Sequence, residues 1–152
     1  MPDLRDYLSE ARQLERQGEF VEALCCYEAM LRDPLIDQDQ PLLEATGIGM
    51  AHLLIAQAAQ PGQSDRQARL IDRAIAVLDR AVGAPPHNRP SALLLAEAYG
   101  LRFALFGQRR DLLAANLQID LVAQDGRNVL PETLEKATTL RAQLASIDPP
   151  RV

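Results

Sequence analysis

The residues of this chain that could do chemistry begin with two adjacent cysteines. Cys25 and Cys26 are the only cysteines in the sequence. A redox pair needs two residues between its cysteines, and a zinc site needs more ligands than these two supply. We therefore expect two small thiols, buried or half-buried, in a reducing compartment.

The histidines and one acidic stretch are the next candidates for metal chemistry. His52 and His87 have no second ligand at helical spacing, and no H-E-x-x-H motif is present. We expect His52 to pack within an apolar helix and His87 to lie in an exposed loop. Asp37, Asp39 and Glu44 lack the glycine and the ligand count of a calcium-binding EF-hand loop. Asp39 is better explained as a helix cap, and the sequence predicts neither a metal nor a cofactor.

Motifs for nucleophilic or phosphate chemistry are also missing. None of the four serines lies in a G-x-S-x-G elbow. Gly47 and Gly49 lie in an expected helix with no strand before them, so they indicate close helix packing rather than a phosphate-binding loop. The Arg109–Arg110 pair is typical of an ordinary helix start on a solvated surface. We therefore expect that the protein is not an enzyme.

The composition describes a helical protein without the charge pattern of a nucleic-acid binder. The 152 residues fit one domain. Aromatic residues make up only 4% of the chain, and the abundant Ala and Leu are good helix formers. The formal net charge is −5, with acidic and basic residues interspersed. Because a nucleic-acid binder would carry a basic stripe, this balance argues against that class.

The apolar stretches do not predict a membrane segment. The start of the chain, Met1 to Asp6, has no basic residues followed by an apolar run, so we expect no signal peptide. The most apolar stretch, Ile48 to Ala59, contains His52 and Gln57 and is too short to span a bilayer. We therefore expect no membrane insertion and a cytoplasmic location.

The elements that must position these residues are helices. Apolar residues recur at spacings of three and four along most of the chain, and no segment alternates as a strand does. Gly18 can take the left-handed conformation that ends a helix, and Pro34 disfavours helix at the residue before it. Residues 33–40 are expected to form a polar loop. The third helix is apolar nearly all round, so we expect it in the middle of the fold.

The pattern predicts one domain of seven helices arranged as three pairs and a single helix. The expected bounds are about 2–32, 41–82 and 90–123 for the pairs and about 131–147 for the last helix. In the sixth helix, Leu113, Leu117 and Leu121 share one face. A row of helix hairpins followed by a single helix is the outline of an α-solenoid.

The first helix pair resembles a tetratricopeptide repeat (TPR). The residues that occupy the characteristic positions of that repeat are Tyr7, Ala11, Leu14, Gly18, Phe20, Ala23, Tyr27 and Met30. Pro34 lies close to the position of the repeat's terminal proline. The second pair matches at Ile48, Gly49, Ala74, Leu78, Ala81 and Pro86, and the third at Tyr99, Gly100, Phe103 and Gly107. The small residues would let the paired helices approach, and large ones such as Tyr7 and Phe20 would fill the space beside them.

The resemblance covers about residues 4 to 123 and implies an all-α fold of antiparallel helix-hairpin repeats. This TPR-like α-solenoid would contain about three pairs and a C-terminal capping helix. The alternative is an irregular helical bundle with one repeat-like hairpin.

The resemblance also implies a concave groove, lined by the first helix of each pair, that holds a peptide or a partner helix. Carried over to this chain, the pattern assigns to the groove Leu8, Arg12, Arg16, Thr46, Met50, Leu53, Leu54, Glu97, Leu101 and Leu105. The residues that clamp a C-terminal carboxylate in chaperone-cofactor members are not recovered as a set, so we do not expect chaperone-tail binding.

The expected function is that of a protein-interaction adaptor or scaffold. A largely apolar groove suits a partner peptide or an amphipathic helix, because monomers rarely leave such a patch open. Alternatively, the last helix fills the groove, or a homodimer forms through the same face. A secretion-type chaperone is a narrower version, since the length, acidic balance and three-pair plan resemble the helical-repeat chaperones of type III translocators. The competing class is a structural subunit of a larger assembly.

Overall fold

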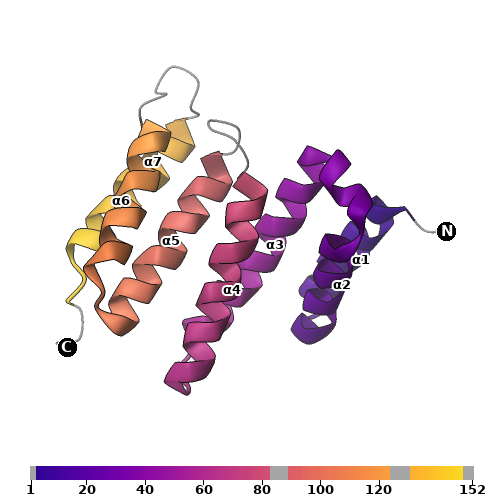
Figure 1. Ribbon diagram of the computed structural model, residues 1–152, viewed down its shortest axis with the longest axis horizontal. Helices are drawn as coiled ribbons and strands as arrows, with labels where there is room; N and C mark the ends of the chain where they lie inside the picture. The colour runs from indigo at the N-terminus through magenta and orange to yellow at the C-terminus, as the bar shows by residue number, and fades with distance from the viewer. Residues whose placement is uncertain (1–2, 83–88, 124–130, 149–152) are drawn as a thin grey trace.

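The computed structural model describes residues 3–82, 89–123 and 131–148 (Figure 1). These residues contain no strand, so the predicted all-α class is confirmed for them. His87 and Pro86 lie outside the described residues. The helices are α1 (Leu4–Arg16), α2 (Phe20–Arg32), the 3₁₀-helix η1 (Pro34–Gln38), α3 (Gln40–Ala58), α4 (Ser64–Val82), α5 (Arg89–Phe106), α6 (Arg109–Ala123) and α7 (Pro131–Ala145).

Local sequence signals set the first and last residues of several helices. Gly18 and Gly107 have φ values of 79° and 73°, in the left-handed region that favours glycine, and they follow α1 and α5. Asp39 caps α3, because its side chain accepts a hydrogen bond from the backbone N–H of Leu42 at 3.2 Å. The predicted cap is therefore confirmed.

The prediction of a polar loop at residues 33–40 is wrong. This stretch contains η1, and the carboxylate of Asp33 accepts a hydrogen bond from the backbone N–H of Leu35 at 3.0 Å. Ile36 is fully buried in the core. Because η1 contacts both α2 and α3, Ile36 serves as an apolar anchor between the first two helix pairs.

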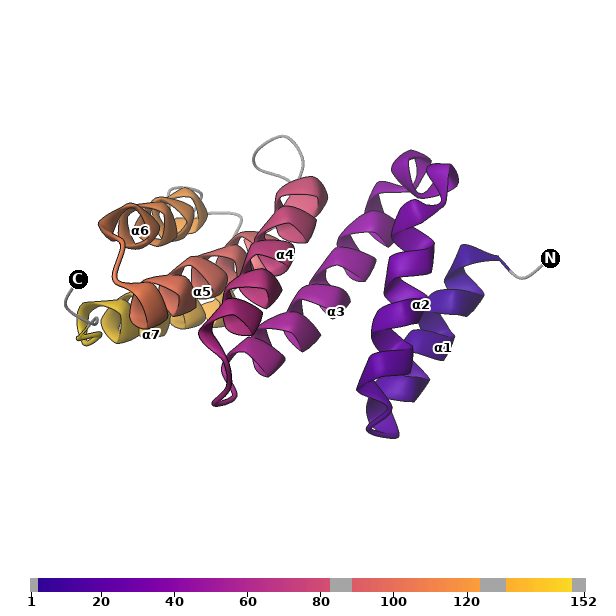
Figure 2. The ribbon, with the colours of Figure 1, turned by 60° about the horizontal axis from the view of Figure 1, so that its bottom comes forward.

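The helices form one row from α1 to α7 (Figures 1 and 2). Each α-helix packs against the next one in the chain. The odd-numbered helices also contact one another in order, α1 with α3, α3 with α5 and α5 with α7. Among the described residues, no two even-numbered helices make contacts of comparable extent. The odd-numbered helices therefore share one side of the molecule.

Two apolar clusters form the core. The larger one joins α1 to α5 through side chains such as Tyr27, Leu54 and Ile71. The smaller one joins α5, α6 and α7 through side chains such as Ile119 and Leu144. Since α5 contributes to both clusters, it ties the last two helices to the rest of the row.

Two glycines of α3 allow close helix packing, as predicted. A Cβ atom on Gly47 would lie 2.6 Å from the Cβ of Ala81 in α4. On Gly49 it would lie 2.6 Å from the hydroxyl oxygen of Tyr27 in α2. These distances are too short for carbon atoms, so α3 needs both glycines to approach α2 and α4.

The large residues of the first pair are less buried than predicted. Ala11, Ala23 and Tyr27 are buried, but Tyr7 and Phe20 are exposed. The expectation that Tyr7 and Phe20 fill the space beside the paired helices is wrong. Tyr7 lies on α1, the last helix of the described row, and Phe20 lines a hollow among α2, α3 and α4.

No helix in the described ranges is long and apolar enough to cross a membrane.

Candidate binding surface

The ten predicted groove residues do not form one surface. Thr46, Met50 and Leu54 belong to the core of the molecule, and the hydroxyl of Thr46 donates a hydrogen bond to the Leu42 carbonyl at 2.7 Å. These three side chains therefore do not line an open groove, which corrects their assignment. The reason is that α3 is apolar nearly all round, so its apolar pattern does not distinguish the side that faces the core.

Leu53 also belongs to the core, at 9% exposed, and the other predicted residues lie at the surface or partly below it. Arg12 and Arg16 are exposed on α1. Leu101 and Leu105 are half-buried against the larger core cluster. Among the hollows formed by the described residues, three predicted residues contribute to the lining, each in a different hollow, and these are Leu8, Leu53 and Glu97.

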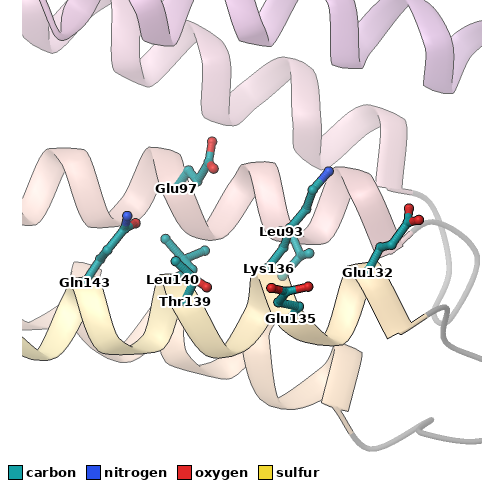
Figure 3. A pocket seen from close by; sticks show the side chains of 8 residues that line it. All are labelled: Leu93, Glu97, Glu132, Glu135, Lys136, Thr139, Leu140 and Gln143. Atoms are coloured by element: carbon teal, nitrogen blue, oxygen red, sulfur yellow. The ribbon is translucent and has the colours of Figure 1, made fainter.

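The largest described hollow, of about 580 Å³, lies between α5 and α7 (Figure 3). Leu93 of α5 and Leu140 of α7 form its apolar part. Its polar lining residues are Glu97, Glu132, Glu135, Lys136, Thr139 and Gln143. All of these except Glu97 come from α7, where they follow one another at helical spacings along a single side.

A smaller hollow of about 130 Å³ extends this one towards α3. It shares Leu93, Glu97 and Lys136 with the larger hollow and adds Ile48 and His52 of α3. We call the two together the α3–α5–α7 hollow. It lies among odd-numbered helices, where the resemblance predicted a groove, but it uses a different side of α3.

His52 corrects one sequence-based expectation. Its side chain is exposed rather than packed within an apolar helix. The neighbours of His52 along α3 are apolar, but at this position the helix faces the hollow, where the imidazole stays in contact with water. The ring is therefore available to a ligand in the hollow.

The α3–α5–α7 hollow has an acidic lining. Glu97, Glu132 and Glu135 supply three carboxylates and Lys136 supplies one ammonium group, which gives a formal charge of −3 + 1 = −2 with His52 neutral. In Figure 3 the side chains of Glu97, Glu132, Glu135 and Lys136 lie around those of Leu93 and Leu140. An apolar floor with acidic groups around it favours a ligand that is apolar and positively charged.

Sequence reasoning missed most of this site. Of the residues that line the α3–α5–α7 hollow, only Glu97 was among the predicted groove residues. The available signal was the polar face of the last helix, where Glu132, Glu135, Lys136 and Thr139 recur at spacings of three, one and three. That helix was expected to act as a cap.

Two further hollows lie nearer the N-terminus. One of about 250 Å³ lies between α1 and α3 and includes Arg5, Leu8 and Ala45. The other, about 490 Å³, lies among α2, α3 and α4 and includes Phe20, Leu53 and Arg66. The hollow beside α1 also belongs to the side of the molecule formed by odd-numbered helices.

The two adjacent cysteines differ in exposure. Cys25 is exposed, so the expectation of a buried or half-buried thiol is wrong for it and right for Cys26. The pKa of Cys26 is raised, first by burial and then by the nearby charges of Glu10 and Cys25. A raised pKa keeps the thiol protonated and poorly nucleophilic. The described ranges hold no group of three or more His, Cys, Asp or Glu residues that could bind a metal ion.

The chain matches no family model, no curated protein and no solved structure. The resemblance to tetratricopeptide repeats therefore stays a prediction, and the candidate site depends on the geometry described above.

Proposed function

We propose that this protein is an adaptor that binds a segment of a partner protein in the α3–α5–α7 hollow. The observation that carries this proposal is the combination of the apolar floor at Leu93 and Leu140 with the surrounding carboxylates of Glu97, Glu132 and Glu135. Leu93 and Leu140 are 8% and 9% exposed, so the floor offers a small apolar contact area, and the carboxylates attract basic side chains.

The order of helix contacts supports the TPR-like arrangement within this proposal. In a row of stacked hairpins, each repeat contacts only its neighbours. The α-helices of this chain contact their neighbours in order, and the odd-numbered ones also contact each other. In such a solenoid, α7 would be the C-terminal cap, and its polar side would line the last part of the binding surface.

The volume of the hollow limits the size of the partner segment that it can hold. A volume of about 580 Å³ accommodates a few side chains rather than a whole helix. We propose a segment that inserts apolar side chains against Leu93 and Leu140 and places Lys or Arg beside the three glutamates. Either an extended peptide or one face of an amphipathic helix meets this description.

The test uses peptides selected by display for binding to the wild-type protein and then measured by fluorescence polarisation. We expect the selected peptides to combine apolar residues with Lys or Arg. In the Glu97→Lys, Glu135→Lys variant, two carboxylates of the lining become positive, and we expect affinity to fall at least about tenfold. Higher salt should weaken wild-type binding, because the carboxylates are solvated.

A matched control carries the same charge change elsewhere. Glu10 and Glu22 are exposed on α1 and α2 and line none of the hollows described above. The Glu10→Lys, Glu22→Lys variant should keep wild-type affinity. Equal losses in both variants would show a general charge effect, and selected peptides without basic residues would contradict the proposed partner chemistry.

The alternative of a structural subunit has one feature in its favour. This feature is a row of exposed leucines on α6, which lies outside the α3–α5–α7 hollow.

A further inference from the structure

The leucines of α6 form an apolar stripe on its solvent side. Leu113, Leu117 and Leu121 are 71%, 58% and 41% exposed. They are spaced four residues apart, so they lie on one ridge of the helix. In Figure 2, α6 lies at the edge of the molecule, with α5 and α7 on its other side. We call these three residues the leucine stripe.

The fold does not use the leucine stripe for its core. The core side of α6 consists of other residues, among them Ala115, Ile119 and Val122, which pack in the smaller cluster with α5 and α7. Among the described helices, α6 packs extensively only against α5 and α7. Contiguous apolar patches on a monomer commonly mark interaction sites, and here three large side chains lie in water side by side.

We propose that the leucine stripe packs against the leucine stripe of a second copy of this chain, with the two α6 helices antiparallel. A twofold axis at Leu117 would place Leu117 against its own counterpart. Leu113 of one copy would then contact Leu121 of the other. Ridges of residues spaced by four interdigitate in the commonest class of helix packing, so one stripe is complementary to its own copy.

Charge at the ends of α6 supports a second copy in this orientation. Arg109 and Arg110 are exposed in the first turn of α6, where the helix dipole disfavours positive charge. Antiparallel packing moves both arginines beside the C-terminal end of the other α6, where the dipole favours them. That end also carries the carboxylate of Asp120, which is half exposed and pairs with Arg141. A parallel arrangement would instead bring four arginines together.

The interface is small, so the dimer should depend on concentration. Standard stable interfaces bury about 800 Å² per partner, and a single pair of crossed helices provides less than a full interface of this kind. We therefore expect the monomer at low concentration and the dimer at concentrations near and above about 10 μM, which is typical of weak association.

The first experiment measures mass across a concentration series by sedimentation equilibrium. Wild type should change from monomer to dimer, and Leu117→Glu should raise the dissociation constant at least about tenfold. Val21→Glu is the matched control, because Val21 is 69% exposed on α2, far from α6 in the row. It should dimerise like wild type. A wild type that stays monomeric throughout the series, or a Leu117→Glu variant that dimerises normally, would overturn the proposal.

The second experiment tests the register by disulfide formation in a Cys25→Ser, Cys26→Ser background. Leu117→Cys should cross-link to itself under mild oxidation. Leu113→Cys should cross-link poorly to itself but efficiently to Leu121→Cys when the two variants are mixed. Efficient self-cross-linking of Leu113→Cys, together with no cross-link between Leu113→Cys and Leu121→Cys, would mean a parallel pair. This result would overturn the antiparallel arrangement.

Discussion

The guanidinium of Arg102 and the carboxylate of Asp111 form a buried ion pair between α5 and α6. Two nitrogens of Arg102 donate hydrogen bonds to Oδ1 of Asp111, at 2.7 and 3.0 Å. Asp111 is 1% exposed, and its Oδ2 has no hydrogen-bond partner among the residues that the structure describes. Arg102 also donates to Asp72 of α4 at 2.9 Å and lies 5.5 Å from the centre of the Tyr99 ring. One side chain thus connects three consecutive helices.

The first prediction concerns this ion pair. Replacing Arg102 with Met keeps an unbranched apolar stem but leaves the charge of Asp111 buried without its cation. Breaking a buried pair from one side costs about 3–5 kcal/mol in the free energy of unfolding. Because the Arg102 side chain is 22% exposed, water can enter, and we expect the lower end of that range. Urea unfolding followed by circular dichroism measures the change.

The control for this prediction removes both partners. The Arg102→Met, Asp111→Leu double variant has no buried charge, and such replacements are often nearly neutral or stabilising. It should therefore be more stable than Arg102→Met alone. A double variant that is less stable than the single one would show that Asp111 stabilises the fold by a route other than its pairing with Arg102.

The second prediction tests the close packing of α3 and α4. In Gly47→Ala, the new methyl group meets the Cβ of Ala81 at 2.6 Å, and neither atom can rotate away. Overpacking of this kind costs about 1–3 kcal/mol, more than alanine's advantage of about 1 kcal/mol in helix propensity. We expect a net loss of stability in thermal or urea unfolding, partly restored by Ala81→Gly.

Gly62→Ala is the matched glycine control. A new Cβ on Gly62 would lie 3.9 Å from the nearest heavy atom, and the φ of Gly62 is not in the left-handed region. The substitution should be neutral or stabilise by up to about 1 kcal/mol, through the unfolded state. If Gly47→Ala were equally harmless, the separation of α3 and α4 in solution would be larger than in this structure.

The third prediction concerns stability at alkaline pH. The hydroxyl of Tyr27 donates a hydrogen bond to Oε1 of Glu15 at 2.7 Å. The pKa of Tyr27 is raised, first by burial, then by this hydrogen bond and by the charge of Glu15. An unfolded tyrosine loses its proton near pH 10, whereas the folded protein retains it to higher pH. Since the folded state then binds more protons, its stability should fall as pH rises above about 10.

Tyr27→Phe measures this effect. At neutral pH the variant should lose about 1 kcal/mol with the hydrogen bond, but its stability should decline less steeply above about pH 10. Glu15→Gln keeps a hydrogen-bond acceptor without the charge and should give an intermediate slope. Urea unfolding over an alkaline pH series compares the three proteins, and identical slopes for wild type and Tyr27→Phe would contradict the prediction.

The fourth prediction separates two roles of Asp39. Its Oδ1 caps α3, while its Oδ2 lies 3.4 Å from a guanidinium nitrogen of Arg5. Asp39→Ala should cost about 1 kcal/mol in thermal or urea unfolding, as a lost cap does. Asp39→Asn retains the cap and should stay close to wild type, as should Arg5→Ala, because exposed ion pairs contribute little. A loss in Asp39→Asn equal to that in Asp39→Ala would favour the ion pair instead.

The sequence by itself determined the all-α class and most of the helix ends. The first helix pair was expected at about residues 2–32, and its two helices are found at Leu4–Arg16 and Phe20–Arg32. These signals are local, since Gly18 ends one helix through its own backbone conformation and Asp39 starts another through a side chain three residues from its partner. The buried Ile36 was missed because its segment is short and lies between Asp33 and Asp39, and only contacts with α2 and α3 make it a core residue.

Only the tertiary structure decided which side of each helix faces the core. α6 has two apolar stripes, and the periodicity of its sequence does not rank them. The smaller residues Ala115 and Val122 pack inside, whereas the leucine stripe lies outside. In α3, the sequence pattern likewise did not indicate that Met50 is buried and His52 is exposed. Helical periodicity depends on residues three and four apart along one helix. Burial depends on the packing of α3 against α2, α4 and α5, and of α6 against α5 and α7, which exists only in the folded protein.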